Sequence, residues 1–232
     1  LDEIAEASGG VADFIDSPDS IVSFFEQAVK SMQDTVVQNA QLTLRLASGV
    51  TPRQVWQVLP MISNLGYRPL SDRDVQVTLG ELEKGQPRSL LVELLISPRP
   101  AGTYRVAQAE ISYDVPGLKL VGEKVKTDIM LDFSTDAVRA KQYDAEVMNI
   151  VEKVTAFKLQ TRALEEAKMG NVAGASQKLR AAATRLLEMG EDELAQSALE
   201  EAENLEQRGQ MSSRGTKKLR YETRKLTQRL SP

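Results

Sequence analysis

A strand predicted at Val121–Phe133 constrains the fold of this chain more than any other feature. Its apolar residues alternate with Lys124, Lys126, Asp128 and Asp132, which is the period-two pattern of a half-buried strand. The sequence before this strand contains further alternating stretches, whereas nearly all of the sequence after it has helical periodicity. We therefore predict a multidomain α+β protein in which this strand is the last of a central sheet.

The composition of the 232 residues excludes several functional classes. With no cysteine and no histidine, the chain can form neither disulfides nor Cys–His or Ser–His catalytic pairs. A zinc site or an active site would need carboxylates alone, as in glycosidases. Because the acidic residues lie in runs typical of solvated helix surfaces, we expect no enzymatic activity and no metal or cofactor bound by this chain.

The chain carries no recognisable targeting signal. No apolar run approaches the roughly 18 residues of a membrane span, and the N-terminus lacks the basic and apolar regions of a signal peptide. The absence of cysteine fits a reducing compartment and favours the cytoplasm. Because the sequence begins with Leu1 rather than Met, we expect it to be a fragment of a longer protein.

Residues 1–34 are predicted to form a helix, a short strand at Val11–Ile15 and a second helix. Ser17 and Pro18 have the residue types of an N-cap and a first helical position, and this helix extends to about Gln33. Its two apolar stripes consist of Ile21, Phe24, Ala28 and Met32, and of Val22, Phe25 and Val29. A helix that is apolar over so much of its circumference requires burial on more than one side. Three partners could bury this helix: the following domain, a second copy of the chain through a homodimer or domain swap, or an upstream domain. Phe24 and Phe25 are therefore candidate interaction residues.

Residues 35–136 are predicted to form an antiparallel β-sandwich of immunoglobulin-like type. Four rows of alternating apolar residues predict strands: Leu42 to Leu46, Val75 to Leu79, Leu90 to Ile96, and Ala107 to Tyr113. Strands at this spacing, separated by turn residues, favour a sandwich over a parallel sheet. Val50–Tyr67 breaks the alternation and contains Trp56, which we interpret as a core residue rather than a ligand contact because its neighbours are apolar.

Residues 137–232 are predicted to form an antiparallel helical bundle. Each of three apolar stripes with helical spacing is followed by a glycine, at Gly170, Gly190 and Gly209, as expected of helix C-termini. The short intervals imply antiparallel neighbouring helices. Alanine at contact positions resembles the packing of tetratricopeptide repeats, although the period is one helix. A peptide-binding helical module therefore remains an alternative.

The last two predicted helices carry opposite charge. Glu191–Glu206 contains seven acidic residues and no basic one, whereas Arg214–Arg229 contains seven basic residues and one acidic one. The candidate interaction residues of the basic helix are Arg214, Lys217, Lys218, Arg220, Arg224 and Lys225. Because the acidic block is its neighbour in the sequence, we favour packing between the two helices, with a seam of Leu219, Leu226 and Leu230, over nucleic-acid or membrane binding.

The N-terminal residues carry a resemblance to a known family. The run LDEIAEASGG from Leu1 to Gly10, the strand ending at Ile15 and the helix opened by Ser17 and Pro18 resemble the C-terminal α–β–α end of a von Willebrand factor type A (VWA) domain. The resemblance covers residues 1–34 firmly and the remainder loosely. It implies that the metal-binding Asp-x-Ser-x-Ser motif lies upstream of Leu1, and that Mg²⁺ binds only there.

Two segments of this chain resemble metal loops, and helix capping explains both. Asp16–Ser20 has proline in place of the first serine of the family motif, and we interpret it as a helix N-terminus. Asp132–Asp136 resembles a calcium loop, but it lacks the glycine turn and the downstream glutamate, so we interpret it as a strand end followed by an N-cap.

The resemblance implies a non-catalytic scaffold that supports an upstream VWA domain and binds a protein ligand or subunit. In that family the last helix can shift as the metal site changes, which would make Pro18–Gln33 a mechanical link. The alternative is a stand-alone peptide-binding helical module on a β-sandwich support.

Overall fold

The computed structural model describes residues 17, 21–23, 25–26, 29 and 35–228. These residues form two compact units. The first contains the described residues up to Gln57 together with Asn64–Gln142, and the second contains Val58–Ser63 and the described residues from Tyr143 onward.

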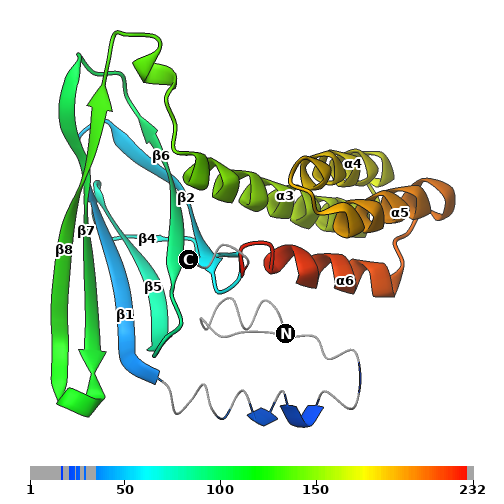
Figure 1. Ribbon diagram of the computed structural model, residues 1–232, viewed down its shortest axis with the longest axis horizontal. Helices are drawn as coiled ribbons and strands as arrows, with labels where there is room; N and C mark the ends of the chain where they lie inside the picture. Colours follow the sequence, from blue (N-terminus) through cyan, green and yellow to red (C-terminus); the bar gives the residue numbers. More distant parts are fainter. Residues whose placement is uncertain (1–16, 18–20, 24, 27–28, 30–34, 229–232) are drawn as a thin grey trace. The chain divides into compact units, whose positions relative to one another are not determined.

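Two β-sheets make up the first unit (Figure 1). A five-stranded sheet has the order β4-β5-β1-β7-β8, and a three-stranded sheet has the order β3-β2-β6. The strands are β1 Thr35–Leu46, β2 Val50–Leu59, β3 Ser63–Asn64, β4 Arg68–Pro69, β5 Asp74–Glu83, β6 Ser89–Ile96, β7 Gly102–Val115 and β8 Leu120–Phe133. All neighbouring strands of the larger sheet pair antiparallel, as the sequence predicted.

The core of this unit lies between the two sheets. It contains the inward row of β1 (Leu42, Leu44 and Leu46) and that of β5 (Val75, Val77 and Leu79), together with Val55 of β2 and Ala107 of β7. The predicted row from Leu90 to Ile96 on β6 packs against it, half-buried. All four rows of alternating apolar residues therefore form strands with the predicted face inward.

Strand β2 corrects the prediction for Val50–Tyr67. No strand was predicted in this segment because it breaks the alternation, but Val50–Leu59 is a strand. Val55, Trp56, Val58 and Leu59 are all buried, so both faces are covered and the alternation disappears. The interpretation of Trp56 as a buried residue is confirmed.

Strand β8 confirms the predicted strand but not its half-burial. The strand lies at the edge of the five-stranded sheet (Figure 1), and every residue from Leu120 to Asp132 is exposed. The reason is the unequal size of the two sheets. The three-stranded sheet is narrower, and among the described residues none buries the apolar side chains of β8.

Four helices form most of the second unit: α3 Ala145–Lys168, α4 Val172–Glu188, α5 Asp192–Arg208 and α6 Ser213–Arg224. Helix α3 begins at Asp144, whose carboxylate accepts hydrogen bonds from the backbone N–H groups of Glu146 and Val147 at 2.9 and 3.0 Å. The N-cap predicted within Asp132–Asp136 is therefore wrong, because α3 is capped by Asp144. Asp136 instead accepts from the N–H of Val138 at 2.8 Å, in the turn that follows β8.

Gly170, Gly190 and Gly209 follow α3, α4 and α5 as predicted. Their φ angles of 80°, 75° and 71° lie in the left-handed region that ends helices and that glycine adopts without a steric penalty. Helix α4 packs on both α3 and α5, and α6 packs on α3 and α5. Alanines allow this close approach, because Ala175, Ala182, Ala183, Ala195, Ala198 and Ala202 are all buried.

The acidic and basic helices are neighbours, as the charge pattern predicted. Buried Glu201 of α5 accepts hydrogen bonds from the backbone N–H and the hydroxyl of Ser212, at 2.7 and 2.6 Å. Ser212 is the N-cap of α6, so this carboxylate lies at the positive end of the helix dipole. The seam residues Leu219 and Leu226 are buried. Helix α6 ends at Arg224, earlier than predicted, and Leu230 lies outside the described residues.

Most predictions for residues 1–34 lie outside the described residues, including the first helix, the strand at Val11–Ile15 and Phe24. The described residues 21–23, 25–26 and 29 are helical. Ile21, Val22, Phe25 and Val29 are exposed, so the two described sheets do not bury them. No helix among the described residues is both long and apolar enough to span a membrane.

Candidate functional site

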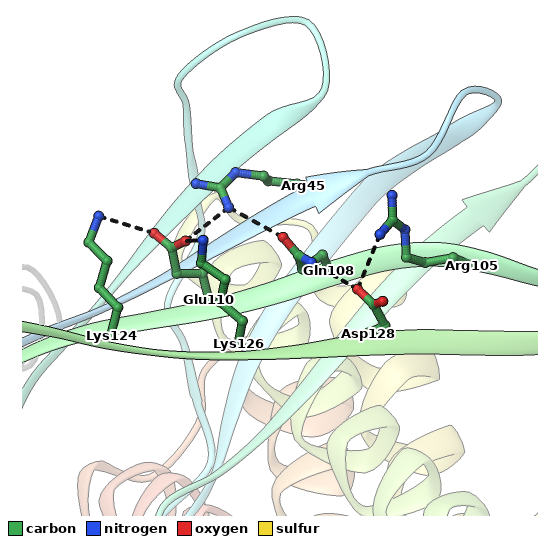
Figure 2. Close-up of polar contacts among 7 residues, drawn as sticks. All are labelled: Arg45, Arg105, Gln108, Glu110, Lys124, Lys126 and Asp128. Atoms are coloured by element: carbon green, nitrogen blue, oxygen red, sulfur yellow. Dashed lines mark hydrogen bonds and ion pairs between the residues drawn. The ribbon is translucent and has the colours of Figure 1, made fainter.

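A network of polar and charged side chains lies on strands β1, β7 and β8 of the five-stranded sheet, on the face opposite to the core (Figure 2). Strand register brings its members together. Gln108 of β7 lies opposite Arg45 of β1 and Asp128 of β8, and Glu110 of β7 lies opposite Lys126 of β8. Because side chains alternate across a strand, all of these point to the same face.

Glu110 is the centre of this network. Its carboxylate lies 2.9 Å from Nη1 of Arg45, 3.0 Å from Nζ of Lys126 and 3.5 Å from Nζ of Lys124. The Glu110 side chain is only 6% exposed, whereas the three cationic side chains are 41–55% exposed. The cations therefore cover the carboxylate and present their own charge to solvent.

The network extends along β7 and β8 (Figure 2). Arg45 also donates to Oε1 of Gln108 at 3.4 Å, and Nε2 of Gln108 donates to Oδ1 of Asp128 at 2.9 Å. Arg105 donates to the same oxygen of Asp128 at 3.4 Å. We call these seven residues, Arg45, Arg105, Gln108, Glu110, Lys124, Lys126 and Asp128, the Glu110 network. It links three strands, and its cations outnumber its carboxylates.

The electrostatics of the network favour an ionised Glu110. The hydrogen bond from Arg45, followed by that from Lys126, lowers the pKa of Glu110 from 4.5 to about 2, although partial burial opposes this shift. A carboxylate that stays ionised at neutral pH is a poor proton donor and a weak base. The arrangement is therefore suited to joining strands and to presenting an ordered cationic surface.

The low pKa of Glu110 can be measured directly. We expect Glu110 to titrate at about 2 when its carboxyl ¹³C chemical shift is followed against pH. Arg45→Met should raise this pKa towards 4.5, because the hydrogen bond from Arg45 is the largest cause of the shift. Lys124→Met should raise it less, because Lys124 acts only through its charge.

The same shift predicts how stability depends on pH. The folded protein holds Glu110 at a lower pKa than the unfolded chain does, so the contribution of the network is fully present above about pH 4.5. It should be lost as the pH falls from there through about 2. Glu110→Gln should weaken this acid sensitivity. A normal pKa for Glu110 in the folded protein would contradict the prediction.

The candidate interaction residues predicted from the sequence do not join this network. Phe25 is 63% exposed, and Arg214, Lys217 and Lys218 on α6 are exposed as well. Arg220 and Lys225 are half-buried, and Nζ of Lys225 lies 3.6 Å from the ring centroid of Tyr221. Arg224 is buried, so little of its surface could take part in docking. An interaction through the remaining residues stays a prediction.

Sequence reasoning identified only part of the Glu110 network. Lys124, Lys126 and Asp128 were assigned to the polar face of their strand, but Arg45 and Glu110 were not singled out. Both occupy outward positions next to apolar inward residues, which is the signal that could have identified them. Their contact depends on the register of β1 against β7, which spans 65 residues of sequence.

The segment that resembles a calcium loop forms turn contacts. Asp132 accepts a hydrogen bond from the hydroxyl of Thr103 at 2.5 Å, and the N–H of Asp136 donates to the hydroxyl of Ser134 at 3.1 Å. Within the part of the chain that the structure describes, no three acidic side chains are grouped so that they could hold a metal ion. Apart from Ser17, the segment Asp16–Ser20 lies outside that part.

The fold is shared with a known class of structure. The von Willebrand factor type A protein from Catenulispora acidiphila superposes with a TM-score of 0.77 at 15% identity, over 97% of this chain and 55% of that chain. The chain thus has a VWA-like α+β fold with antiparallel sheets and four helices among its described residues. The ArnB paralog VWA2 from Sulfolobus acidocaldarius has a TM-score of 0.41 at 14% identity, over 87% of this chain and 46% of that chain.

Sequence comparison adds a particular relative. Residues 145–229 match the family described as Sll0103-like, C-terminal alpha-helical domain. The uncharacterized protein sll0103 of Synechocystis sp. (strain ATCC 27184 / PCC 6803 / Kazusa) is 29% identical over 119 residues. These residues make up 50% of this chain and 28% of that relative, so the match spans less than a third of its length.

Proposed function

We propose that this chain is a non-catalytic protein-interaction region of a VWA protein. In this proposal it supports metal-dependent ligand binding by a VWA domain that precedes it, and it transmits changes at that site. The main support is the likeness to the Catenulispora acidiphila protein, which covers nearly all of this chain but only 55% of the other. This chain would then be the supporting part, with an immunoglobulin-like sandwich and a helical bundle.

The N-terminal segment supports this arrangement. Ile21, Val22, Phe25 and Val29 are apolar, helical and exposed, which is unfavourable for a helix in water. The last helix of a VWA domain would bury such side chains against the rest of that domain. The segment is then positioned to carry a shift from the ligand site to the sandwich.

The metal site belongs elsewhere in this proposal. The 232 residues contain no Asp-x-Ser-x-Ser motif, and the described acidic residues form no group that fits a metal ion. The residues of this chain therefore do not fit the Mg²⁺ site of the family, and we assign them no part in metal chemistry. Any Mg²⁺ dependence would originate in residues that precede Leu1.

The alternative function, peptide binding by the helices alone, has less support. Tetratricopeptide-like recognition needs an open groove beside closely packed helices. The small residues that suggested this packing, among them Ala175, Ala182 and Ala198, are buried between helices. They account for helix packing without a ligand.

Hydrogen exchange tests the proposal directly. The native sequence upstream of Leu1 would be expressed together with this chain, and amide exchange at residues 21–29 would be compared with that of the 232-residue chain alone. We expect slower exchange in the longer protein, because the VWA domain covers this helix. Addition of Mg²⁺ should change exchange at the same residues.

Two outcomes would overturn the proposal. One is an upstream sequence without an Asp-x-Ser-x-Ser motif, and the other is exchange at residues 21–29 that neither the upstream part nor Mg²⁺ alters. Selection of peptides on the 232-residue chain distinguishes the alternative. A peptide motif whose binding survives deletion of residues 1–34 but is lost on substitutions in α3–α5 would favour the helical module.

A further inference from the structure

The edge of the five-stranded sheet formed by β8 is long and carries exposed apolar side chains. Val121, Val125, Ile129, Met130 and Leu131 are 37–81% exposed, although β8 is a regular strand of 14 residues. An exposed edge of this kind offers a row of backbone donors and acceptors to another strand. Proteins usually protect such edges with short strands, charged side chains, proline, bulges or a covering segment.

The opposite edge of the same sheet is protected in that way. Strand β4 contains only Arg68 and Pro69, and proline cannot donate a hydrogen bond to a neighbouring strand. Strand β8 has no proline, and its polar face carries charges of both signs: Lys124, Lys126, Asp128 and Asp132. An edge that carries charges of both signs can attract a second strand whose charges are complementary.

We propose that β8 pairs antiparallel with β8 of a second copy of this chain, with Thr127 on the two-fold axis. The two five-stranded sheets then form one continuous sheet. This register pairs Val121–Phe133 of one subunit with the same residues of its partner. The inference concerns self-association through the sheet edge and is independent of the proposed VWA partner.

Charge complementarity supports this register. With Thr127 on the axis, Lys126 lies opposite the partner's Asp128, and the pair occurs twice by symmetry. On the core side, Val125 lies opposite the partner's Ile129. Lys126 would lie between Glu110 of its own chain and the partner's Asp128, so the Glu110 network would continue across the axis.

Neighbouring registers are less favourable. The core-facing side chains of both strands must lie on the same side of the joined sheet. The registers that meet this condition differ by moving the two-fold axis along β8 one residue at a time. An axis at Lys126 pairs Lys124 with the partner's Asp128, but it also places two lysines opposite each other on the axis. An axis at Asp128 pairs Lys124 with the partner's Asp132, but it places two aspartates opposite each other. An axis at Ile129 pairs Lys126 with the partner's Asp132, but it uses only residues 125–133 of the strand. The register with Thr127 on the axis pairs opposite charges, places no like charges opposite each other and uses Val121–Phe133 of the strand.

Single-cysteine variants test the register, since the chain has no cysteine of its own. Residues on the axis lie about 4.5–5.5 Å apart between Cα atoms, which fits a disulfide. Thr127→Cys should therefore form a covalent dimer under mild oxidation, seen on a non-reducing gel. Val121→Cys is the matched exposed control, because its two copies would be about 40 Å apart. Ile129→Cys should also fail to cross-link, and its cross-linking in place of Thr127→Cys would overturn the register.

Charge reversal tests the interface without cross-linking. The 232-residue chain should form a dimer whose population rises with concentration in light scattering. Asp128→Lys should weaken dimerisation by about tenfold or more, because it places two cations opposite each other at both symmetric positions. Asp132→Lys makes the same charge change on the same face but opposite the partner's Gly122, so it should leave dimerisation unchanged. Circular dichroism would verify that both variants fold.

Other results would overturn the proposal. These are a chain that stays monomeric at all accessible concentrations, equal cross-linking of Thr127→Cys and Val121→Cys, or a dimer that Asp128→Lys and Asp132→Lys affect alike. A monomeric longer protein in which β8 is protected from hydrogen exchange would show that an upstream segment occupies the edge instead.

Discussion

Replacing Leu44 with alanine is expected to lower the free energy of unfolding by about 2–5 kcal/mol. Leu44 is 2% exposed and lies on β1, between β5 and β7. Its neighbours on these strands are Val75 and Ala109, and the ladders on both sides fix the backbone. The surrounding sheet can relax little into the space left by the side chain, so most of the cavity should remain.

The measurement is urea denaturation followed by far-ultraviolet circular dichroism, together with hydrogen exchange. Because the chain forms two compact units, a single transition is not assumed, and exchange assigns the loss to a region. Exchange should rise in β1, β5 and β7. Val36→Ala is the matched control on β1, because Val36 is exposed, and it should change stability by less than about 0.5 kcal/mol. Equal effects of the two substitutions would contradict the placement of Leu44 in the core.

The strands that could be predicted from the sequence are those with one apolar, buried face and one polar, exposed face. Leu42, Leu44 and Leu46 alternate with more polar residues because one face of β1 meets the core and the other carries the Glu110 network. The pattern fails for β2, where Val55 and Trp56 are consecutive and both buried. A strand covered on both faces has no polar face, and no period of two remains to be recognised.

The alternation of β8 predicted which face is apolar but not whether that face is covered. Coverage depends on the number of strands in the opposing sheet, which no local pattern specifies. The candidate site was also beyond local patterns. Lys126 and Asp128 were recognisable on one strand, but the burial of Glu110 by Arg45 and Lys126 requires the register of three strands at once.

The helical unit was easier to predict because its signals are local. Gly170 and Gly190 end helices through their own backbone conformation, and the next helix follows within a few residues. The contribution of Val58–Ser63 to this unit could not be predicted, because strands β4–β8 separate the segment from α3 in the sequence. Its apolar residues were interpreted only as neighbours of Trp56.

Replacing Ile62 with alanine should destabilise the helical unit rather than the sheets, by about 2–5 kcal/mol. Ile62 is fully buried, and its N–H donates to the carbonyl of Arg224 at 2.9 Å. The hydroxyl of Thr227 donates to the carbonyl of Val58, so two hydrogen bonds hold this segment to the end of α6. Removal of the side chain leaves a cavity among these contacts.

Hydrogen exchange distinguishes this effect from a general loss of stability. Exchange should rise in α6 and in the residues after it, and remain unchanged in β1 and β7. Val147→Ala is the control within the same unit, because Val147 on α3 is exposed, and it should have little effect. A rise confined to β1, β5 and β7 would mean that Val58–Ser63 stabilises the sheets, and the boundary between the two units would have to be redrawn at β2.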